Sequence, residues 1–172
     1  MVLYSKPMRK AQTNYAFIDG TNLHLSTLGI GWPLDTRKFR HYLEEKHGVT
    51  KAYYFLGRVK SEQKLYDTLQ SRGYELVFKD TYIGKDGKLK GNVDSELVLH
   101  AMMYYRVYKN AVIVTSDGDF ACLTKYLKSK NKLQIVVACS RGGCSHLIEE
   151  AVGIPYICYI DDLRKKLEYI KH

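Results

Sequence analysis

The chain has 172 residues, and its hydrophobic fraction of 45% is enough to bury the core of one domain without disulfide or metal support. Its 27 Lys and Arg residues outnumber 18 Asp and Glu residues, and the net charge of +9 favours a polyanionic partner such as nucleic acid. The four cysteines lack zinc-site spacing, and no apolar run has the length of a membrane span or a signal peptide, so we expect a cytoplasmic protein with reduced thiols and no membrane contact.

The first half of the chain alternates between strand and helix patterns. Residues 1–14 are polar and basic and are expected to form a flexible arm, which leaves 15–172 as a single domain. Beyond the arm, short apolar runs predict strands, and apolar residues at helical spacing predict helices. In order, we expect a strand over 15–19, a helix over 35–47 capped by Asp35, a strand over 52–56, a helix over 61–72, a strand over 74–78 and a basic, glycine-rich loop or hairpin over 79–91.

The second half repeats this alternation. Parallel strands need crossover helices that cover both faces of the sheet, so the alternation predicts an α/β fold. We expect a three-layer sandwich with a mainly parallel sheet and helices on both faces. The predicted elements are a helix over 94–108, a strand over 111–115, a helix marked by Phe120, Leu123 and Leu127, a strand over 133–138, a short helix over 145–151, an edge strand over 154–159 and a final basic helix over 163–171 capped by Asp161.

Four carboxylates follow the predicted strands and turns on three separate segments. Asp19 ends the first strand, Asp117 and Asp119 follow the fourth, and Asp94 opens a helix after the glycine-rich loop. Ligands of open parallel sheets bind at the carboxyl ends of strands, and carboxylates that converge there repel one another unless a cation is present. Hard oxygen ligands favour Mg²⁺ or Mn²⁺. The alternative is structural: Asp94 and Asp119 as helix caps, and Asp19 and Asn22 as turn residues.

Three stretches carry a family resemblance. Phe17-Ile-Asp-Gly-Thr-Asn-Leu23, Lys90-Gly-Asn-Val-Asp94 and Val114-Thr-Ser-Asp-Gly-Asp-Phe120 resemble, in order, the signature motifs of NYN domains, which belong to the PIN-like nuclease group. The resemblance implies a PIN-like sandwich whose acidic cluster binds Mg²⁺ or Mn²⁺ and cleaves RNA. By position it implies that Asp19, Asp94 and Asp117 bind metal, that Asp119 is the second acid of its motif, that Asn22 orients substrate or a metal-bound water, and that Thr115 and Ser116 lie near a phosphate.

Two positions depart from the family pattern. His100 stands six residues after Asp94 where many relatives have an acid, and the pair Ala151-Val152 replaces an Ala-Asp pair. Both changes remove negative charge and are expected to weaken metal affinity or activity. We expect His100 to be a packing or supporting histidine, because a helix turns it away from Asp94.

Basic residues supply the candidate phosphate contacts. Arg141, in a glycine-rich turn after the fifth strand, is the best single candidate, together with Lys90 in the loop before Asp94. We assign none of the 15 tyrosines to binding. Single-stranded RNA is the favoured partner, while DNA and a homodimer are left open. The further lysines considered are Lys85, Lys88, Lys125, Lys128, Lys130 and Lys132.

The sequence thus favours a metal-dependent nuclease, with endoribonuclease as the preferred activity. The main alternative is a catalytically weak RNA-binding or regulatory module that retains the fold and the acidic pocket. A small-molecule phosphotransferase or a Toprim-like enzyme is a weaker alternative, and Toprim-like sites prefer Glu where Asp19 stands. A nucleotide-cofactor enzyme is disfavoured by the lack of a G-x-G-x-x-G or Walker A sequence.

Overall fold

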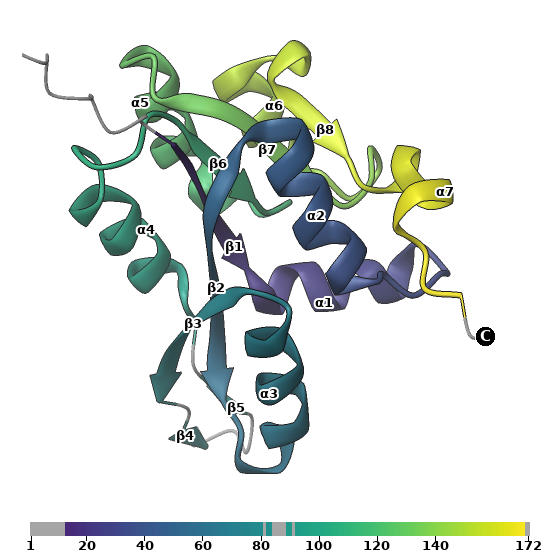
Figure 1. The fold of residues 1–172 in the computed structure, drawn as a ribbon. Coiled ribbons are helices and arrows are strands. Elements are labelled where there is room, and N and C mark those ends of the chain that lie inside the picture. Colours follow the sequence, from purple (N-terminus) through teal and green to yellow (C-terminus); the bar gives the residue numbers. More distant parts are fainter. Residues whose placement is uncertain (1–12, 81, 84–88, 91, 171–172) are drawn as a thin grey trace, which may run out of the picture.

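The structure is built around a parallel sheet whose central strand is the first strand of the chain (Figure 1). The computed structural model describes residues 13–80, 82–83, 89–90 and 92–170, and the predicted arm falls outside this part up to residue 12. Among these residues the main sheet has six strands, each parallel to its neighbours, which confirms the predicted sheet type. From edge to edge they are β3 (Tyr74–Asp80), β2 (Val49–Arg58), β1 (Asn14–Asp19), β6 (Ala111–Val114), β7 (Leu133–Ala138) and β8 (Ile157–Tyr159).

The two central strands are apolar along almost their whole length because helices cover them on both faces. All four residues of β6 are buried, as are the last five of β1. Ile18 lies opposite Val114 in the register, so the two strands end side by side. The chain leaves β1 towards one face of the sheet and β6 towards the other, and this divergence creates the switch point at which open α/β sheets bind ligands.

Helices on the two faces complete a three-layer sandwich, as predicted from the sequence (Figure 1). On one face, Ile18, Leu43 and Leu69 belong to a core that also includes Phe39 and Tyr66. The helices of this face are α1 (Gly20–Gly29), α2 (Thr36–His47), α3 (Gln63–Ser71) and α7 (Arg164–Leu167), with the 3-10 turns η1 (Lys60–Glu62) and η4 (Asp161–Leu163) nearby in sequence.

The opposite face has a core centred on Phe17 and Phe55, against which Leu97, Phe120 and Ile148 pack. Its helices are α4 (Asp94–Met103), α5 (Ala121–Ser129) and α6 (His146–Val152), with the 3-10 turns η2 (Gly118–Phe120) and η3 (Ile154–Tyr156). The predicted glycine-rich loop contributes a short antiparallel pair, β4 (Tyr82–Ile83) and β5 (Leu89–Lys90), just before α4.

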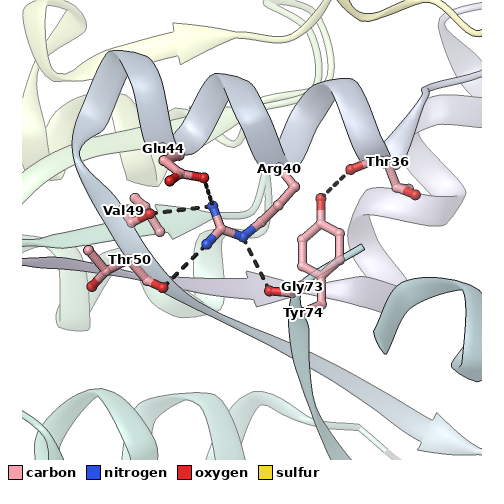
Figure 2. A network of polar contacts seen from close by, with 7 residues as sticks. All are labelled: Thr36, Arg40, Glu44, Val49, Thr50, Gly73 and Tyr74. Atoms are coloured by element: carbon pink, nitrogen blue, oxygen red, sulfur yellow. Dashed lines mark hydrogen bonds and ion pairs between the residues drawn. The ribbon is translucent and has the colours of Figure 1, made fainter. Parts of the chain in front are cut away.

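Arg40 ties α2 to the edge half of the sheet (Figure 2). Its guanidinium donates to the carbonyl oxygens of Gly73, Val49 and Thr50 at 3.2 to 3.3 Å and also pairs with Glu44. One planar, five-donor group therefore satisfies carbonyls at the start of β2 and just before β3.

Several elements differ from the sequence expectation, and residues 154–156 of the expected edge strand form the 3-10 turn η3 instead. The helix α1 was not predicted, and α4 ends at Met103 rather than continuing to Tyr108, whose hydroxyl donates to the Ala101 carbonyl at 2.9 Å. The predicted cap of the last helix by Asp161 is wrong. The Asp161 carboxylate instead accepts a hydrogen bond from the Trp32 indole at 3.1 Å, and α7 is only four residues long.

Candidate metal centre

Three carboxylates meet at the carboxyl edge of the sheet, beside the switch point. Asp94 is the first residue of α4, and Asp117 and Asp119 lie at the start of η2 after β6. One oxygen from each lies within 4.8 Å of the others, and we call these residues the acidic cluster. Asp94 and Asp117 are partly buried, whereas Asp119 is exposed, so the cluster is open to solvent on one side.

Asp19 lies deeper than the acidic cluster and does not belong to that close group. Only 4% of its surface is exposed. One carboxylate oxygen accepts the Asn22 backbone N–H at 3.0 Å and thereby caps α1, and the other accepts the Thr115 hydroxyl at 3.4 Å. Burial raises the pKa of Asp19 to about 6, the Asn22 bond opposes this, and the nearby charges of Asp94 and Asp117 raise it further.

Asp117 is held in the same manner as Asp19. Its carboxylate accepts the Asp119 backbone N–H at 3.0 Å and caps η2, while its own backbone N–H donates to the Thr115 hydroxyl at 3.1 Å. The helix-cap alternative for Asp94 and Asp119 is therefore wrong, since neither side chain caps a helix. Asp19 and Asp117 are the caps, and capping fixes the direction in which each carboxylate points.

Asp94 is positioned by Asn92, a residue to which the sequence analysis gave no role. The Asn92 amide donates to the Asp94 carboxylate at 2.7 Å, and its oxygen accepts the Asp94 backbone N–H at 2.8 Å. Burial raises the pKa of Asp94, the Asn92 bond opposes the rise, and Lys79 lowers it. Lys79 in turn pairs with Glu96 at 3.1 Å, which places a cation and a further acid near the cluster. The Asn-x-Asp spacing is the signal that points to Asn92.

Thr115 and Ser116, predicted to approach a phosphate, are instead buried beneath the carboxylates. The Thr115 hydroxyl is engaged by both Asp19 and Asp117. Ser116 donates its N–H to the Asn22 side-chain oxygen at 2.8 Å, and its hydroxyl accepts the Cys139 N–H at 3.0 Å. These residues, together with Asn22, bind α1, β6 and β7 to one another and so hold the carboxylates in place.

Glycine is required at two points of close approach around the site. A Cβ on Gly118 would lie 2.5 Å from the Ser145 hydroxyl, which caps the start of α6. A Cβ on Gly20 would overlap the Tyr54 ring and come within 2.6 Å of the Phe55 carbonyl oxygen. The glycines beside Asp19 and Asp117 therefore allow α1 and α6 to pack tightly around the cluster.

Three of the predicted phosphate contacts have partners within the protein. Arg141 follows β7, is 65% exposed at its side chain, and pairs with Asp162 at 2.8 Å. Lys128 and Lys132 donate to the Val152 and Tyr108 carbonyls at 2.6 Å. The remaining candidates are Lys125 and Lys130, which are exposed on and after α5, Lys85 and Lys88, which lie outside the described residues, and Lys90, whose backbone is in β5 and whose side chain is not described.

The two departures from the family motif both have structural roles. The His100 ring packs against Phe55 with centroids 5.3 Å apart, and its Nδ1 lies 2.9 Å from the Glu96 carbonyl oxygen. Val152, the last residue of α6, is fully buried in the core. Among the described residues, neither position belongs to the group that could hold a metal ion.

The acidic cluster is compatible with a divalent cation. All of its donors are carboxylate oxygens, the hard ligands that such ions prefer, and neither His nor Cys belongs to the described group. Burial is the main cause of the raised pKa of Asp19, and the charges of Asp94 and Asp117 add to it; a bound cation would offset the repulsion among these acids. Within the described part of the chain, no helix combines the length and apolar character that crossing a membrane requires.

Comparisons with known proteins agree with this architecture. A family model described as the NYN domain matches residues 15–153. The low amplitude and bright protein LabA of Synechococcus elongatus is 26% identical, over 88% of this chain and 86% of LabA. The crystal structure of a protein of unknown function from Vibrio parahaemolyticus matches with a TM-score of 0.75 and 18% identity, over 94% of this chain and 99% of that one, and shows the same fold.

Proposed function

The chain belongs to the NYN domain family, and from this premise we propose that it is a metal-dependent ribonuclease that hydrolyses RNA phosphodiester bonds. A nuclease-like, RNA-related function is what the family indicates. The observation that carries the proposal is the convergence of Asp94, Asp117 and Asp119 within 4.8 Å at the switch point of the sheet, above the buried Asp19. The net charge of +9 supports a polyanionic substrate.

Asp94, Asp117 and Asp119 would hold Mg²⁺ or Mn²⁺, with Asp19 as a fourth carboxylate at the base of the site. When bound, such an ion lowers the pKa of a water molecule and offsets the negative charge that grows on the phosphate. In our proposal the carboxylate of Asp119, the most exposed of these acids, also accepts the proton of the attacking water. Asp19 and Asp117, fixed by the caps that they form, keep the negative charge of the site in one place.

Substrate positioning is assigned to residues at the rim. Arg141 follows β7 on the edge that bears the cluster, and in our proposal its guanidinium exchanges Asp162 for a phosphate. Lys90, two residues before Asn92, is the second proposed contact. Thr115, Ser116 and Asn22 support the carboxylates rather than touch the substrate, because their hydrogen bonds are directed into the fold.

The test is cleavage of labelled single-stranded RNA by the purified protein. We expect cleavage with Mn²⁺ or Mg²⁺, no cleavage in EDTA, and loss of cleavage in Asp117→Asn, because an amide keeps the cap on η2 but removes the charge. Asp67→Asn, an exposed change on α3, is the matched control and should cleave normally. Activity that persists in Asp117→Asn would refute the assigned site. Internal cleavage of a circular RNA would identify an endonuclease.

A second candidate function is an RNA-binding module that does not cleave. The observation in its favour is that His100 and Val152, which replace acids in the family pattern, are both committed to packing. RNA binding without products under every divalent metal, by a protein whose fold is intact, would favour this function over the ribonuclease.

A further inference from the structure

The far ends of α4 and α5 meet at the edge of the sheet opposite the acidic cluster. The Tyr105 and Tyr126 rings lie 6.2 Å apart there, and lysine ammonium groups lie over both rings. Lys130 is 5.7 Å from the centre of Tyr126, and Lys132 is 5.2 Å from that of Tyr105. With two exposed neighbours in the α4–β6 loop, the group forms what we call the tyrosine–lysine patch: Tyr105, Arg106, Lys109, Tyr126, Lys130 and Lys132.

The tyrosine–lysine patch is uniformly positive. No Asp or Glu occurs from Leu97 to Ser116 or from Phe120 to Ile148, the two stretches that supply it. Within the described residues, none of its four cations is paired with a carboxylate. Glu75, on the edge strand β3, is already paired with Lys51 at 3.1 Å. An anion at the patch therefore meets four cations, and the two stretches that supply the patch add no negative charge.

The side chains of the patch have two different roles, one structural and one in binding. Lys132 donates to the Tyr108 carbonyl at 2.6 Å and so supports the surface from within. Tyr126 is 42% exposed, and Arg106, Lys109 and Lys130 are exposed beside it. Exposed aromatic faces next to cations are the combination that binds single-stranded nucleic acid, because bases stack on the rings while phosphates meet the cations.

The patch is separate from the acidic cluster. The helix α4, labelled in Figure 1, begins at Asp94 of the cluster and ends at Met103, two residues before Tyr105 of the patch, so about 15 Å of helix lies between the two regions. At roughly 3.4 Å per stacked nucleotide, a single strand needs about five nucleotides to cover that distance. A short RNA therefore reaches one of the two regions, and a longer RNA reaches both.

We propose that the tyrosine–lysine patch is a second contact surface for single-stranded RNA, which holds the substrate at a distance from the scissile phosphate. This inference deepens the proposed ribonuclease function and rests on it for the identity of the polyanion. The rings favour RNA over an anionic membrane or an acidic protein, because those partners would use the cations but have no bases to stack on Tyr126.

The test measures RNA binding without cleavage, in the Asp117→Asn background and in EDTA, by fluorescence anisotropy of a labelled oligouridylate long enough to reach both regions. The double variant Lys109→Glu/Lys130→Glu is expected to bind about tenfold or more weakly and to reduce the slope of log affinity against log salt by roughly two. The matched control is Lys60→Glu/Lys64→Glu, which makes the same charge change on exposed residues of η1 and α3 and is expected to alter affinity much less.

The aromatic contribution is tested at Tyr126. Tyr126→Ala is expected to lower affinity roughly tenfold with little change in salt dependence, and Tyr126→Phe is expected to restore binding because it keeps the ring. Circular dichroism of each variant shows whether the fold is kept.

Equal affinity of the patch and control double variants for the long RNA would overturn the inference. Loss of binding to anionic phospholipid vesicles in the patch variants, with RNA affinity unchanged, would also overturn it and identify the membrane as the partner. The proposed function is judged separately. If the protein cleaves RNA but the patch variants bind RNA normally, the ribonuclease proposal holds and the patch proposal fails. If binding depends on the patch but no RNA is cleaved, the patch proposal holds and the ribonuclease proposal fails.

Discussion

Replacing Asp19 by Asn should make the metal-free protein more stable near neutral pH. Burial, helped by the charges of Asp94 and Asp117, raises the pKa of Asp19 from 3.8 to about 6. At about 1.4 kcal/mol per pH unit, the ionised carboxylate costs the fold about 3 kcal/mol when no cation is bound. Asn caps a helix as well as Asp does, but its amide cannot accept the Thr115 hydroxyl in the same way, a loss of about 1 kcal/mol. The expected net gain is about 2 kcal/mol.

The effect of Asp19→Asn on the unfolding free energy should depend on pH. Because the pKa is higher in the folded than in the unfolded state, the unfolded chain ionises first as the pH rises, and the cost builds up between about pH 4 and pH 6. The gain from Asp19→Asn should therefore be fully present near pH 7 and largely absent near pH 4. Urea unfolding in EDTA at these two pH values measures it.

The matched control for this experiment is Asp35→Asn. Asp35 also caps a helix, accepting the Arg37 and Lys38 N–H groups at 2.8 and 3.3 Å, but it stands apart from the acidic cluster. We expect Asp35→Asn to leave the unfolding free energy nearly unchanged at both pH values. If Asp19→Asn behaves in the same way, or stabilises the fold equally at both pH values, the argument from crowded, buried charge is wrong.

Three further predictions follow from individual contacts. Gly20→Ala should lower the unfolding free energy by about 2 kcal/mol or more, because the new Cβ would clash with β2. The control Gly29→Ala lies in open space on the same helix and should be neutral or stabilise by up to about 1 kcal/mol. Equal effects of the two variants would refute the close approach at Gly20. Arg40→Met should lower the free energy of urea unfolding by about 2 to 3 kcal/mol, because three backbone carbonyls lose their donor. The control Arg37→Met, at an exposed residue of the same helix, should change it little. A small loss in Arg40→Met would contradict the inference that Arg40 stabilises the contact between α2 and the sheet. Mn²⁺ affinity, measured by calorimetry, should fall as the pH drops through about 6, because protonated Asp19 no longer attracts the ion. An affinity that does not change with pH in this range would show that Asp19 does not contribute to metal binding.

The sequence predicted the strands well because their signal is local. Buried parallel strands are short apolar runs, and Ala111–Val114 and Leu133–Ala138 are such runs almost from end to end. The helix α1 lacked the corresponding signal, since Leu23 is buried while Leu25 and Leu28 are exposed, so its apolar residues mark no single face. Asp19 therefore looked like a turn residue when it is a helix cap.

The ends of the last two misjudged helices depend on distant partners. Apolar spacing continues past Met103, but Tyr108 packs against Phe17 with ring centroids 5.6 Å apart, a contact between residues far apart in sequence. At the carboxyl end, the Tyr169 N–H donates to the Pro33 carbonyl at 2.8 Å and draws the chain out of a helical path. Local patterns contain no information about either contact.

The acidic residues at the site were found by their position after strands, but the roles within the site were not. The sequence made Asp94 and Asp119 the cap candidates, whereas the caps are Asp19 and Asp117. The difference arises because a carboxylate caps whichever backbone N–H groups the turn presents to it, and these two turns pack closely against the rest of the fold at Gly20 and Gly118. Asn92 was missed because its role depends on its hydrogen bonds to Asp94, and an Asn in a loop gives no sequence signal of such bonds.

The central position of β1 has a consequence for how the protein folds during synthesis. β1 pairs on one side with β2, which follows within a few dozen residues, and on the other with β6, which begins at Ala111. The ribosome must therefore deliver the chain as far as β6 before the first strand has both neighbours, and contacts of such long sequence separation slow folding. Asp19 and Asp117 come together only in that late step. Any metal-dependent activity is thus withheld from chains that have not yet been synthesised as far as Asp117.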